Sequence, residues 1–548
     1  MATQPEAPCL PPSRLHPPTY HEPLLLTSPS TSQALLIWFN RTSRTRPMPW
    51  RKPWIDPSSF HGSPSELARA VSTRAYEVWV SEIMLQQTRV ATVVPYYETW
   101  ISKWPTVQDL ANATQDEVLG VWKGLGYYSR ATRLWQGARV VVERSMNAGD
   151  GGEGEDASLI PKSPEELLKI PGIGRYTAGA ISSIAFGVPT AVLDGNVARV
   201  LSRQLGLYAD VKEKKIVEML WEVAEKLVRD ISGVTDDEAL RSEIPGQWNQ
   251  AVMELGATVC TPLSPKCGDC PIRDTCRAYA EGTALVAQTS AVEPVTDIEE
   301  LCSSCVKMEI EEIEVIGEDT EETDALPRKR KRRKVEPKIS KPTISKYFGS
   351  LRSRKTVSQE ESTEMVDIQD LKRSDSHSKY TSIPKYCSLF PKKVIKKPRA
   401  EEECVVCIIE QRIHNPDVER KSRWLIEQRP AKGLLASLWQ FPQTTLLASE
   451  TSNPKSRKSI ARLSLRGLSR TGSTLDVVEL GSITHILTHI KFTLHVYSVV
   501  IETENESKQD SSGQEKMRKW VLFDEVETAT LSTGMRKCWE LYRSFVEL

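Results

Sequence analysis

The chain has 548 residues, which is enough for two or three domains with sizeable cores. Its 72 lysines and arginines balance 72 aspartates and glutamates, so the overall charge neither indicates nor excludes a polyanionic partner. No apolar run is long enough to span a bilayer, and the proline-rich N-terminus, which contains Glu6, is typical neither of a secretory signal nor of a transit peptide. Free cysteines and a metal-type cluster of cysteines both fit a reducing compartment.

Residues 1–31 are predicted to form a disordered tail, and residues 32–285 an all-α domain. In the second range, short apolar runs at helical spacing are joined by glycine and proline turns, and no strand alternation persists. Thr106 and Thr114 each precede such a run and are predicted helix N-caps.

A hairpin between two helices is predicted in the run I-P-G-I-G-R-Y-T-A-G-A-I (170–181). Pro171 ends one helix, and Gly172 and Gly174 are expected to adopt positive φ in a tight turn. Free backbone N–H groups at the start of the next helix can bind a phosphate without reading a base. Taken alone, the P-G-x-G pattern also fits any tight turn between helices.

Four of the eleven cysteines fall in one short polar loop with the spacing C-x6-C-x2-C-x5-C. Four thiolates can close a shell around one tetrahedral metal or a cubane cluster, and the prolines and glycine between them favour tight turns. Scattered core cysteines or two disulfides are the alternative. Zinc is the alternative metal, but zinc sites usually show two C-x2-C knuckles and this loop has one. The cysteines are Cys260, Cys267, Cys270 and Cys276.

Residues 286–390 are predicted to be a disordered charged linker, acidic at first and then basic, with few aromatic residues. The run P-R-K-R-K-R-R-K-V (327–335) has the form of a nuclear localisation signal, or alternatively of a nonspecific DNA tether. The run K-P-T-I-S-K-Y-F (341–348) resembles the sliding-clamp (PCNA) box, although Lys341 replaces the customary glutamine. Its helical plug would be formed by Ile344, Tyr347 and Phe348.

From residue 391 onward the pattern predicts a second, α+β domain that extends to residue 548. Runs such as C-V-V-C-I-I-E and F-T-L-H-V-Y-S-V-V are typical of strands, and M-R-K-C-W-E-L-Y-R-S-F predicts a final helix. Cys404 and Cys407, three residues apart on one predicted strand, should point to opposite faces into core.

Several motifs resemble a known family. The cysteine loop is similar to the [4Fe–4S] loop of the endonuclease III superfamily, and the hairpin precedes it by about ninety residues, as in that superfamily. The runs W-V-S-E-I-M-L-Q-Q-T-R-V, W-K-G-L-G-Y-Y-S-R-A, A-V-L-D-G-N-V-A-R-V-L-S-R and W-N-Q-A-V-M-E-L-G-A-T-V-C are similar to MutY-type adenine DNA glycosylases, over nearly all of 34–280. The resemblance implies a monomeric enzyme that removes adenine paired with 8-oxoguanine or guanine from duplex DNA. It also implies that the hairpin glycines contact the DNA backbone.

The resemblance assigns two catalytic carboxyl groups. Glu82 lies in an apolar helical context that would raise its pKa, and it would protonate adenine at N7. Asp194 lies at a predicted helix start and would stabilise or trap the sugar cation. Superfamily members that nick the strand have a lysine where this chain has Tyr176, so a monofunctional glycosylase is expected. Tyr176 and Asn196 would hydrogen-bond near the carboxyl groups. An exposed helix residue and an ordinary N-cap are the alternatives for Glu82 and Asp194.

The remaining matched positions imply recognition roles. The adenine pocket would be lined by Arg46, Trp50, Leu85 and Gln250. The partner base would be contacted by Gln87, Thr88, Leu125 and Tyr127. Trp50 and Tyr127 fit a role as core aromatics equally well by residue type.

The second domain resembles the Nudix-like domain of the same family, without the catalytic Nudix box. In H-I-L-T-H (485–489), Thr488 and His489 match the family loop that checks 8-oxoguanine, and Leu487 replaces its usual phenylalanine. Some animal relatives carry an extra zinc site in the linker, where this chain has Cys302 and Cys305. Alternatives for the whole chain are a thymine-mismatch glycosylase or a noncatalytic DNA-damage binding protein. A nuclear enzyme is expected, and the sequence leaves a mitochondrial isoform open.

Overall fold

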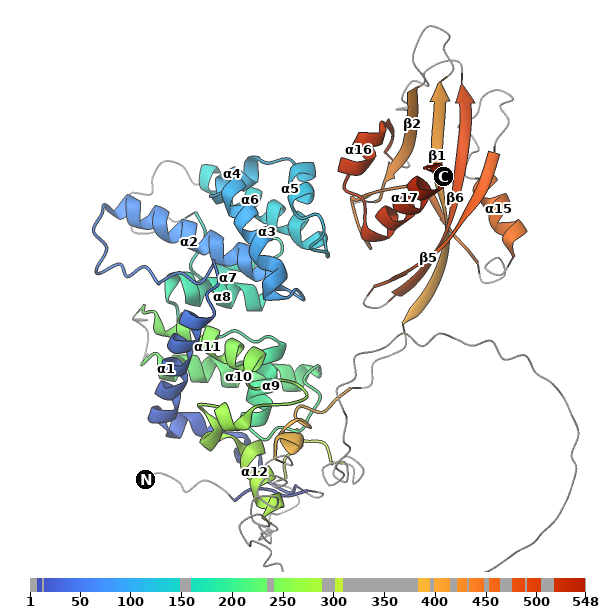
Figure 1. Cartoon of the computed structure of the whole chain (residues 1–548). Helices are drawn as coiled ribbons and strands as arrows, with labels where there is room; N and C mark the ends of the chain where they lie inside the picture. Colours follow the sequence, from blue (N-terminus) through green and yellow to red (C-terminus); the bar gives the residue numbers. More distant parts are fainter. Residues whose placement is uncertain are drawn as a thin grey trace, which may run out of the picture.

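The structure is a computed structural model with two differently built parts, one all-helical and one with a mixed sheet (Figure 1), which confirms the predicted fold class. No helix in the part of the chain that it describes is long and apolar enough to cross a membrane. The basic run 327–335 and the clamp-like run 341–348 lie outside the described residues. Those residues are 7–11, 14–147, 159–233, 241–287, 301–308, 383–394, 399–413, 421–430, 433–447, 453–463, 476–487, 490–503 and 517–547.

The helical part consists of two lobes that meet at α8. Helix α2 packs on α3, α6 and α8, while α11 packs on α1, α8, α9 and α10 (Figure 1). In chain order the helices are η1 (Pro18–His21), η2 (Leu24–Thr27), α1 (Pro29–Thr45), α2 (Pro64–Leu85), α3 (Val90–Lys103), α4 (Val107–Asn112), α5 (Gln115–Val121), α6 (Ser129–Asn147), α7 (Pro164–Leu167), α8 (Arg175–Phe186), α9 (Gly195–Gln204), α10 (Lys214–Ile231), α11 (Ile244–Thr258), η3 (Cys267–Asp269), η4 (Arg273–Thr275) and α12 (Arg277–Val286).

Local sequence accounts for several helix boundaries. Thr106 and Thr114 cap α4 and α5, each in a capping box with the acidic residue three positions on, which confirms both predicted caps. Ser63 caps α2 in the same way with Glu66. The C-terminal half of α2 is then buried on every side, because α3, α6 and α8 surround it. A helix buried all round carries any acidic side chain into the core.

The N-terminal segment is packed, so the prediction of a disordered tail over 1–31 is wrong for residues 14–27. Tyr20 is 1% exposed and donates a hydrogen bond to Glu281 at 2.8 Å, and Arg14 makes an ion pair with the same carboxylate at 2.8 Å. The segment is held by a few buried polar contacts to distant α12. A local hydrophobic pattern cannot reveal such contacts.

The predicted linker, 286–390, is also anchored at both ends. In segment 301–308, Val306 donates its N–H to Tyr208 O at 2.9 Å. In segment 383–394, Tyr386 and Phe390 are buried and Lys392 N donates to Ala209 O at 3.2 Å. The prediction of one disordered stretch is therefore wrong for these two segments. The predicted start of the second domain at 391 is wrong as well, because residues 391–394 continue this anchored segment and β1 begins at Ala400.

The C-terminal part is a mixed sheet with helices on both faces. Strand order is β3-β2-β1-β6-β5, with β4 paired to β1 and β7 to β2; β1 and β6 are parallel and the other pairs antiparallel. Cys404 packs on the face covered by α17 and Cys407 on the face covered by α15, as predicted. The elements are β1 (Ala400–Ile413), β2 (Lys421–Gln428), β3 (Trp439–Gln440), β4 (Gln443–Thr445), α15 (Pro454–Leu463), β5 (Asp476–Ile486), β6 (Ile490–Thr503), β7 (Arg518–Val521), α16 (Phe523–Thr528) and α17 (Thr533–Val546).

Candidate active site and metal centres

Glu82 lies near the end of buried α2 and is only 7% exposed. Burial raises the pKa of Glu82 to about 7, and the negative charge of Asp194 adds to the rise. The hydrogen bond from Tyr176 Oη at 2.6 Å, together with Arg51 and Arg74, acts in the opposite direction. A carboxyl group in this state can hold a proton at neutral pH and donate it, which a general acid requires.

Tyr176 lies in the first turn of α8, directly beside that carboxyl group. Its hydroxyl also contacts Met253 Sδ of α11 at 3.1 Å. Burial first, and then the neighbouring Glu82, raise the pKa of Tyr176 well above the ordinary value. The hydroxyl therefore stays protonated and orients Glu82, and no amine from this position enters the site.

Asp194 is the N-cap of α9, as predicted. Its Oδ1 accepts hydrogen bonds from the backbone N–H groups of Asn196 at 2.9 Å and Val197 at 2.7 Å, and its Oδ2 accepts one from Asn196 Nδ2 at 2.8 Å. Asn196 is fixed in turn by Arg199, which donates to Asn196 Oδ1 at 2.9 Å. The same carboxylate thus caps a helix and faces Glu82 from the other lobe, so the N-cap reading and the catalytic reading are compatible.

The predicted adenine-pocket residues stand on several elements. Arg46, at the end of α1, pairs with Glu254 of α11, and Arg51 pairs with the same carboxylate at 2.6 Å. Glu254 is 2% exposed, and sequence reasoning missed it. Gln250, one turn earlier on α11, donates to Gly246 O at 3.0 Å. Trp50 is 6% exposed, so the structure places it in the core.

The predicted partner-base residues lie on two loops that Arg130 joins. Gln87 and Tyr127 both adopt left-handed φ, 55° and 49°, and Tyr127 is 46% exposed while Leu125 is buried. Buried Arg130 donates to Thr88 Oγ1 at 3.2 Å and to backbone carbonyls of both loops, and its guanidinium lies 5.5 Å from the Tyr127 ring centroid. Arg130 lies in the run W-K-G-L-G-Y-Y-S-R-A, but no role was predicted for it, because its burial is not visible in the sequence.

The hairpin between α7 and α8 has one glycine with positive φ. Gly172 has φ of 86°, and a Cβ there would lie 2.8 Å from Arg133 Cβ. Gly174 has φ of −101° and serves as the N-cap of α8, so the prediction of positive φ for Gly174 is wrong. The extended backbone of an N-cap leaves the first N–H groups of α8 unpaired within the helix, and these remain available to a phosphate.

The four cysteines of the loop surround one cavity with Arg203, which donates to Cys260 Sγ at 3.1 Å. Burial raises the pKa of Cys270 to about 12 and that of Cys276 well above the ordinary thiol value. Four sulfurs around one cavity fit a cluster-binding site, in which the bound iron would deprotonate the thiols. The bound cluster would cross-link the loop from Cys260 to Cys276.

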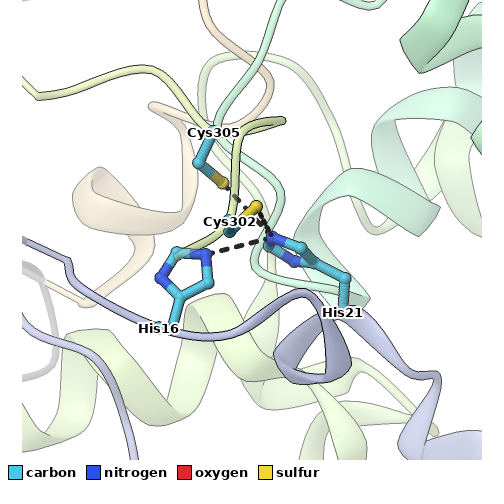
Figure 2. A group of neighbouring side chains, drawn as sticks. All are labelled: His16, His21, Cys302 and Cys305. Carbon is cyan, nitrogen blue, oxygen red and sulfur yellow. Dashed lines mark hydrogen bonds between the residues drawn. The ribbon is translucent and has the colours of Figure 1, made fainter. Parts of the chain in front are cut away.

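A second group of metal-type side chains was only half anticipated. His16, His21, Cys302 and Cys305 each offer one ligand atom, and these atoms all lie within 4.8 Å of one another (Figure 2). His21 Nε2 lies 3.1 Å from His16 Nε2, 3.3 Å from Cys302 Sγ and 3.4 Å from Cys305 Sγ. Cys302 and Cys305 are recognisable in the sequence as a C-x-x-C. Their partners, His16 and His21, lie in the N-terminal segment that was predicted to be disordered.

Within the loop 485–489, only residues up to Leu487 belong to the described chain, so Thr488 and His489 lie outside it. Leu487 N donates to Ile490 O at 2.8 Å, which closes the turn between β5 and β6. Burial lowers the pKa of His485.

Comparison with known proteins identifies the family. The HhH-GPD superfamily base excision DNA repair protein model matches residues 80–226, the iron-sulfur binding domain of endonuclease III matches 260–276, and a NUDIX domain matches 418–541. The adenine DNA glycosylase of Rattus norvegicus is 34% identical over 93% of this chain and 77% of its own length; that of Homo sapiens is 35% identical over 93% and 73%. A solved complex of the C-terminal domain of mouse MUTYH with human PCNA is 28% identical and covers 27% of this chain and 90% of that chain, with a TM-score of 0.21. The chain belongs to the adenine DNA glycosylase family: it is a hydrolase of base excision repair that acts on DNA and carries a [4Fe–4S] cluster.

Proposed function

We propose that this enzyme removes adenine mispaired with 8-oxoguanine or guanine and leaves an intact strand with an abasic site. The observation that carries the proposal is the hydrogen bond of 2.6 Å between Tyr176 and buried Glu82. Where a strand-nicking relative would present a lysine amine, this chain has the hydroxyl of Tyr176, and the acid beside it is Glu82, whose pKa burial raises to about 7. Asp194 faces this acid, so one carboxyl group can donate a proton while the other stabilises positive charge.

The proposed reaction begins when adenine leaves the base stack, because neither carboxyl group can reach it inside a duplex. Glu82 gives its proton to adenine N7. The N-glycosidic bond then breaks, its electron pair goes to the departing base, and positive charge develops on the sugar. Asp194, held by three N–H groups, stabilises this cation or bonds to it, and water completes the hydrolysis. Tyr176 and Asn196 hold the two carboxyl groups in place.

The loops around Gln87 and Tyr127 are proposed to contact the base opposite the adenine. Exposed Tyr127 and the left-handed turn at Gln87 give both side chains access to DNA, and Arg130 fixes the two loops to each other. Thr488 and His489 of the Nudix-like domain are proposed to check the oxidised base as well, on the basis of their sequence alone.

The experiment is a single-turnover assay on duplexes that differ in one base pair. Adenine would be placed opposite 8-oxoguanine, guanine, cytosine or thymine, and a fifth duplex would contain a G:T mispair. We expect excision of adenine opposite 8-oxoguanine and guanine only. Excision of thymine from the G:T duplex would favour the thymine-mismatch alternative. Tight binding without excision of any base would favour the noncatalytic alternative.

We also propose that His16, His21, Cys302 and Cys305 hold a zinc ion. The Nδ1–H of His21 is committed to Leu205 O at 2.8 Å, so its Nε2 presents a lone pair to the other three ligand atoms. Tetrahedral zinc with bonds of about 2.0–2.3 Å separates its ligand atoms by about 3.3–3.8 Å, close to the contacts of 3.1, 3.3 and 3.4 Å. Metal analysis of the full chain should give one zinc beside four irons. Zinc should be lost in His21→Ala, with iron retained.

The basic run 327–335 is proposed to direct the enzyme to the nucleus, and Ile344, Tyr347 and Phe348 to bind the sliding clamp. A fluorescent fusion whose five arginines and lysines at 328–332 are replaced should lose nuclear enrichment. Tyr347→Ala with Phe348→Ala should abolish clamp binding in calorimetry. Unchanged localisation or unchanged affinity would contradict the respective proposal.

A further inference from the structure

The cluster cavity has a fifth cysteine in its wall. Cys387 comes from segment 383–394, far beyond the loop in the sequence, and lines the cavity together with the four loop cysteines. It is 1% exposed and lies in an apolar cluster with Tyr208, Tyr386 and Phe390, against which Cys267 and Cys276 pack. The four-cysteine motif is already complete without it.

The segment that carries Cys387 is fixed to the cluster loop by polar contacts as well. Arg203 donates through Nε to Phe390 O at 3.1 Å and through Nη1 to Cys260 Sγ at 3.1 Å, so one guanidinium joins the segment to a cluster ligand. Tyr386 Oη donates to Glu281 Oε2 of α12 at 2.6 Å. These contacts hold the Cys387 thiol at a defined place beside the cavity.

Cys387 and Cys267 line the same cavity, and Cys267 packs against the apolar cluster that contains Cys387. A sulfur that binds iron is a thiolate and has no proton to give. In a hydrogen bond between these two side chains the proton must therefore sit on Cys387, which makes Cys387 the donor and Cys267 the acceptor. Hydrogen bonds to ligand sulfurs are one of the means by which proteins set the reduction potential of an iron–sulfur cluster.

We propose that Cys387 is a positioning residue of the iron–sulfur centre, whose S–H donates a hydrogen bond to the ligand sulfur of Cys267 and whose side chain closes the cavity to solvent. The hydrogen bond stabilises the more electron-rich state of the cluster, so it raises the reduction potential. Segment 383–394 thereby has a role of its own: it is a lid on the cluster contributed from the far end of the linker. This inference is independent of the mispair that the enzyme recognises.

The test compares Cys387→Ala and Cys387→Ser with wild type in the full chain. Voltammetry on an electrode gives the reduction potential, and the decay of the visible cluster absorbance in air gives solvent access. Cys387→Ala should keep its iron, show a lower potential and bleach faster. Cys387→Ser retains a donor and should restore most of the potential. Cys538→Ala is the matched control, because it removes a fully buried thiol from the C-terminal part, and it should change neither quantity.

Three results would overturn the proposal. An unchanged potential in Cys387→Ala would show that no hydrogen bond reaches the ligand. Loss of iron from a folded Cys387→Ala would show that Cys387 is itself a ligand. If that variant fails to fold, infrared spectra of wild type and Cys387→Ser decide the matter. Their difference should contain an S–H stretching band displaced to low frequency, and a band at the position of a free thiol would contradict the proposal.

Discussion

At the scale of single residues, the proposed reaction depends on the protonation of Glu82. The apolar neighbours of Glu82 in the sequence predicted a raised pKa, and the structure confirms it, because α2 is buried on all sides at that point. The charges that act on Glu82 could not be predicted in the same way. Arg51 lies outside α2, so its proximity to Glu82 depends on the fold, and so do the ion pairs of Glu254 with Arg46 and Arg51.

Tyr176→Phe should shift the pH profile of adenine excision. The hydroxyl stabilises ionised Glu82, so its removal raises the pKa of the acid above about 7. The decline of the single-turnover rate on the alkaline side should therefore begin at higher pH in the variant. Tyr97→Phe is the control, because the hydroxyl of Tyr97 has no hydrogen bond in the part of the chain that the structure describes. An unchanged pH profile would show that Tyr176 does not influence the pKa of Glu82.

Glu82→Gln should stabilise the protein in alkaline solution. The folded-state pKa of about 7 exceeds the ordinary 4.5, so the folded protein binds more protons between these values and loses stability as pH rises through them. The loss is complete above pH 7 and amounts to roughly 3 kcal/mol, at 1.36 kcal/mol per unit. Denaturant unfolding should show a gain for the variant that is larger at pH 8 than at pH 5. An equal gain at both values would contradict the raised pKa.

At the scale of secondary-structure elements, the helices and turns that carry motifs could be predicted from the sequence. The long-range contacts that hold them in place could not. The capping threonines of α4 and α5, the N-cap at Asp194 and the final helix follow from local sequence. The extended φ of Gly174 was missed, because glycine permits either sign and its neighbours do not decide between them.

The two hairpin glycines should respond differently to alanine. At Gly172, φ is 86° and the new Cβ would approach Arg133 Cβ to 2.8 Å, so Gly172→Ala should destabilise the fold by about 1–3 kcal/mol and displace the start of α8. Binding to mismatched and fully paired duplexes should weaken alike, because a backbone contact does not read bases. Gly174→Ala, with an ordinary φ and open space around the Cβ, is the matched control. Equal affinities in the two variants would contradict the predicted contact of the hairpin with the DNA backbone.

At the scale of the whole molecule, two segments far apart in the sequence converge on α12. Glu281, whose side chain is fully buried, accepts hydrogen bonds from Arg14 and Tyr20 of the N-terminal segment and from Tyr386 near the C-terminal end of the predicted linker. Disorder was predicted for both segments because the first lies in the proline-rich N-terminal tail and the second in the charged linker. Their order depends on single buried carboxylate and metal-type contacts, which have no periodicity to detect.

Glu281→Gln should therefore release both segments together. The substitution leaves Arg14, with a side chain 3% exposed, as an unpaired buried cation, which should cost about 3–5 kcal/mol. Limited proteolysis should then cut within 14–27 and 383–394 faster than in wild type. Glu218→Gln is the control, because its ion pair with Arg175 is exposed and should contribute less than about 1 kcal/mol. Unchanged protease resistance in Glu281→Gln would show that the segments are held by other contacts.

The central claim, that Glu82 drives adenine removal without strand cleavage, is tested most directly by one single-turnover assay. Wild type and Glu82→Gln, both with an intact cluster, would react with a duplex that holds one adenine opposite 8-oxoguanine, and half of each sample would be treated with hot alkali. We predict strand breaks only after alkali for wild type and none for Glu82→Gln. Strand breaks without alkali would reveal an amine nucleophile, and excision by Glu82→Gln at the wild-type rate would contradict its role as the acid.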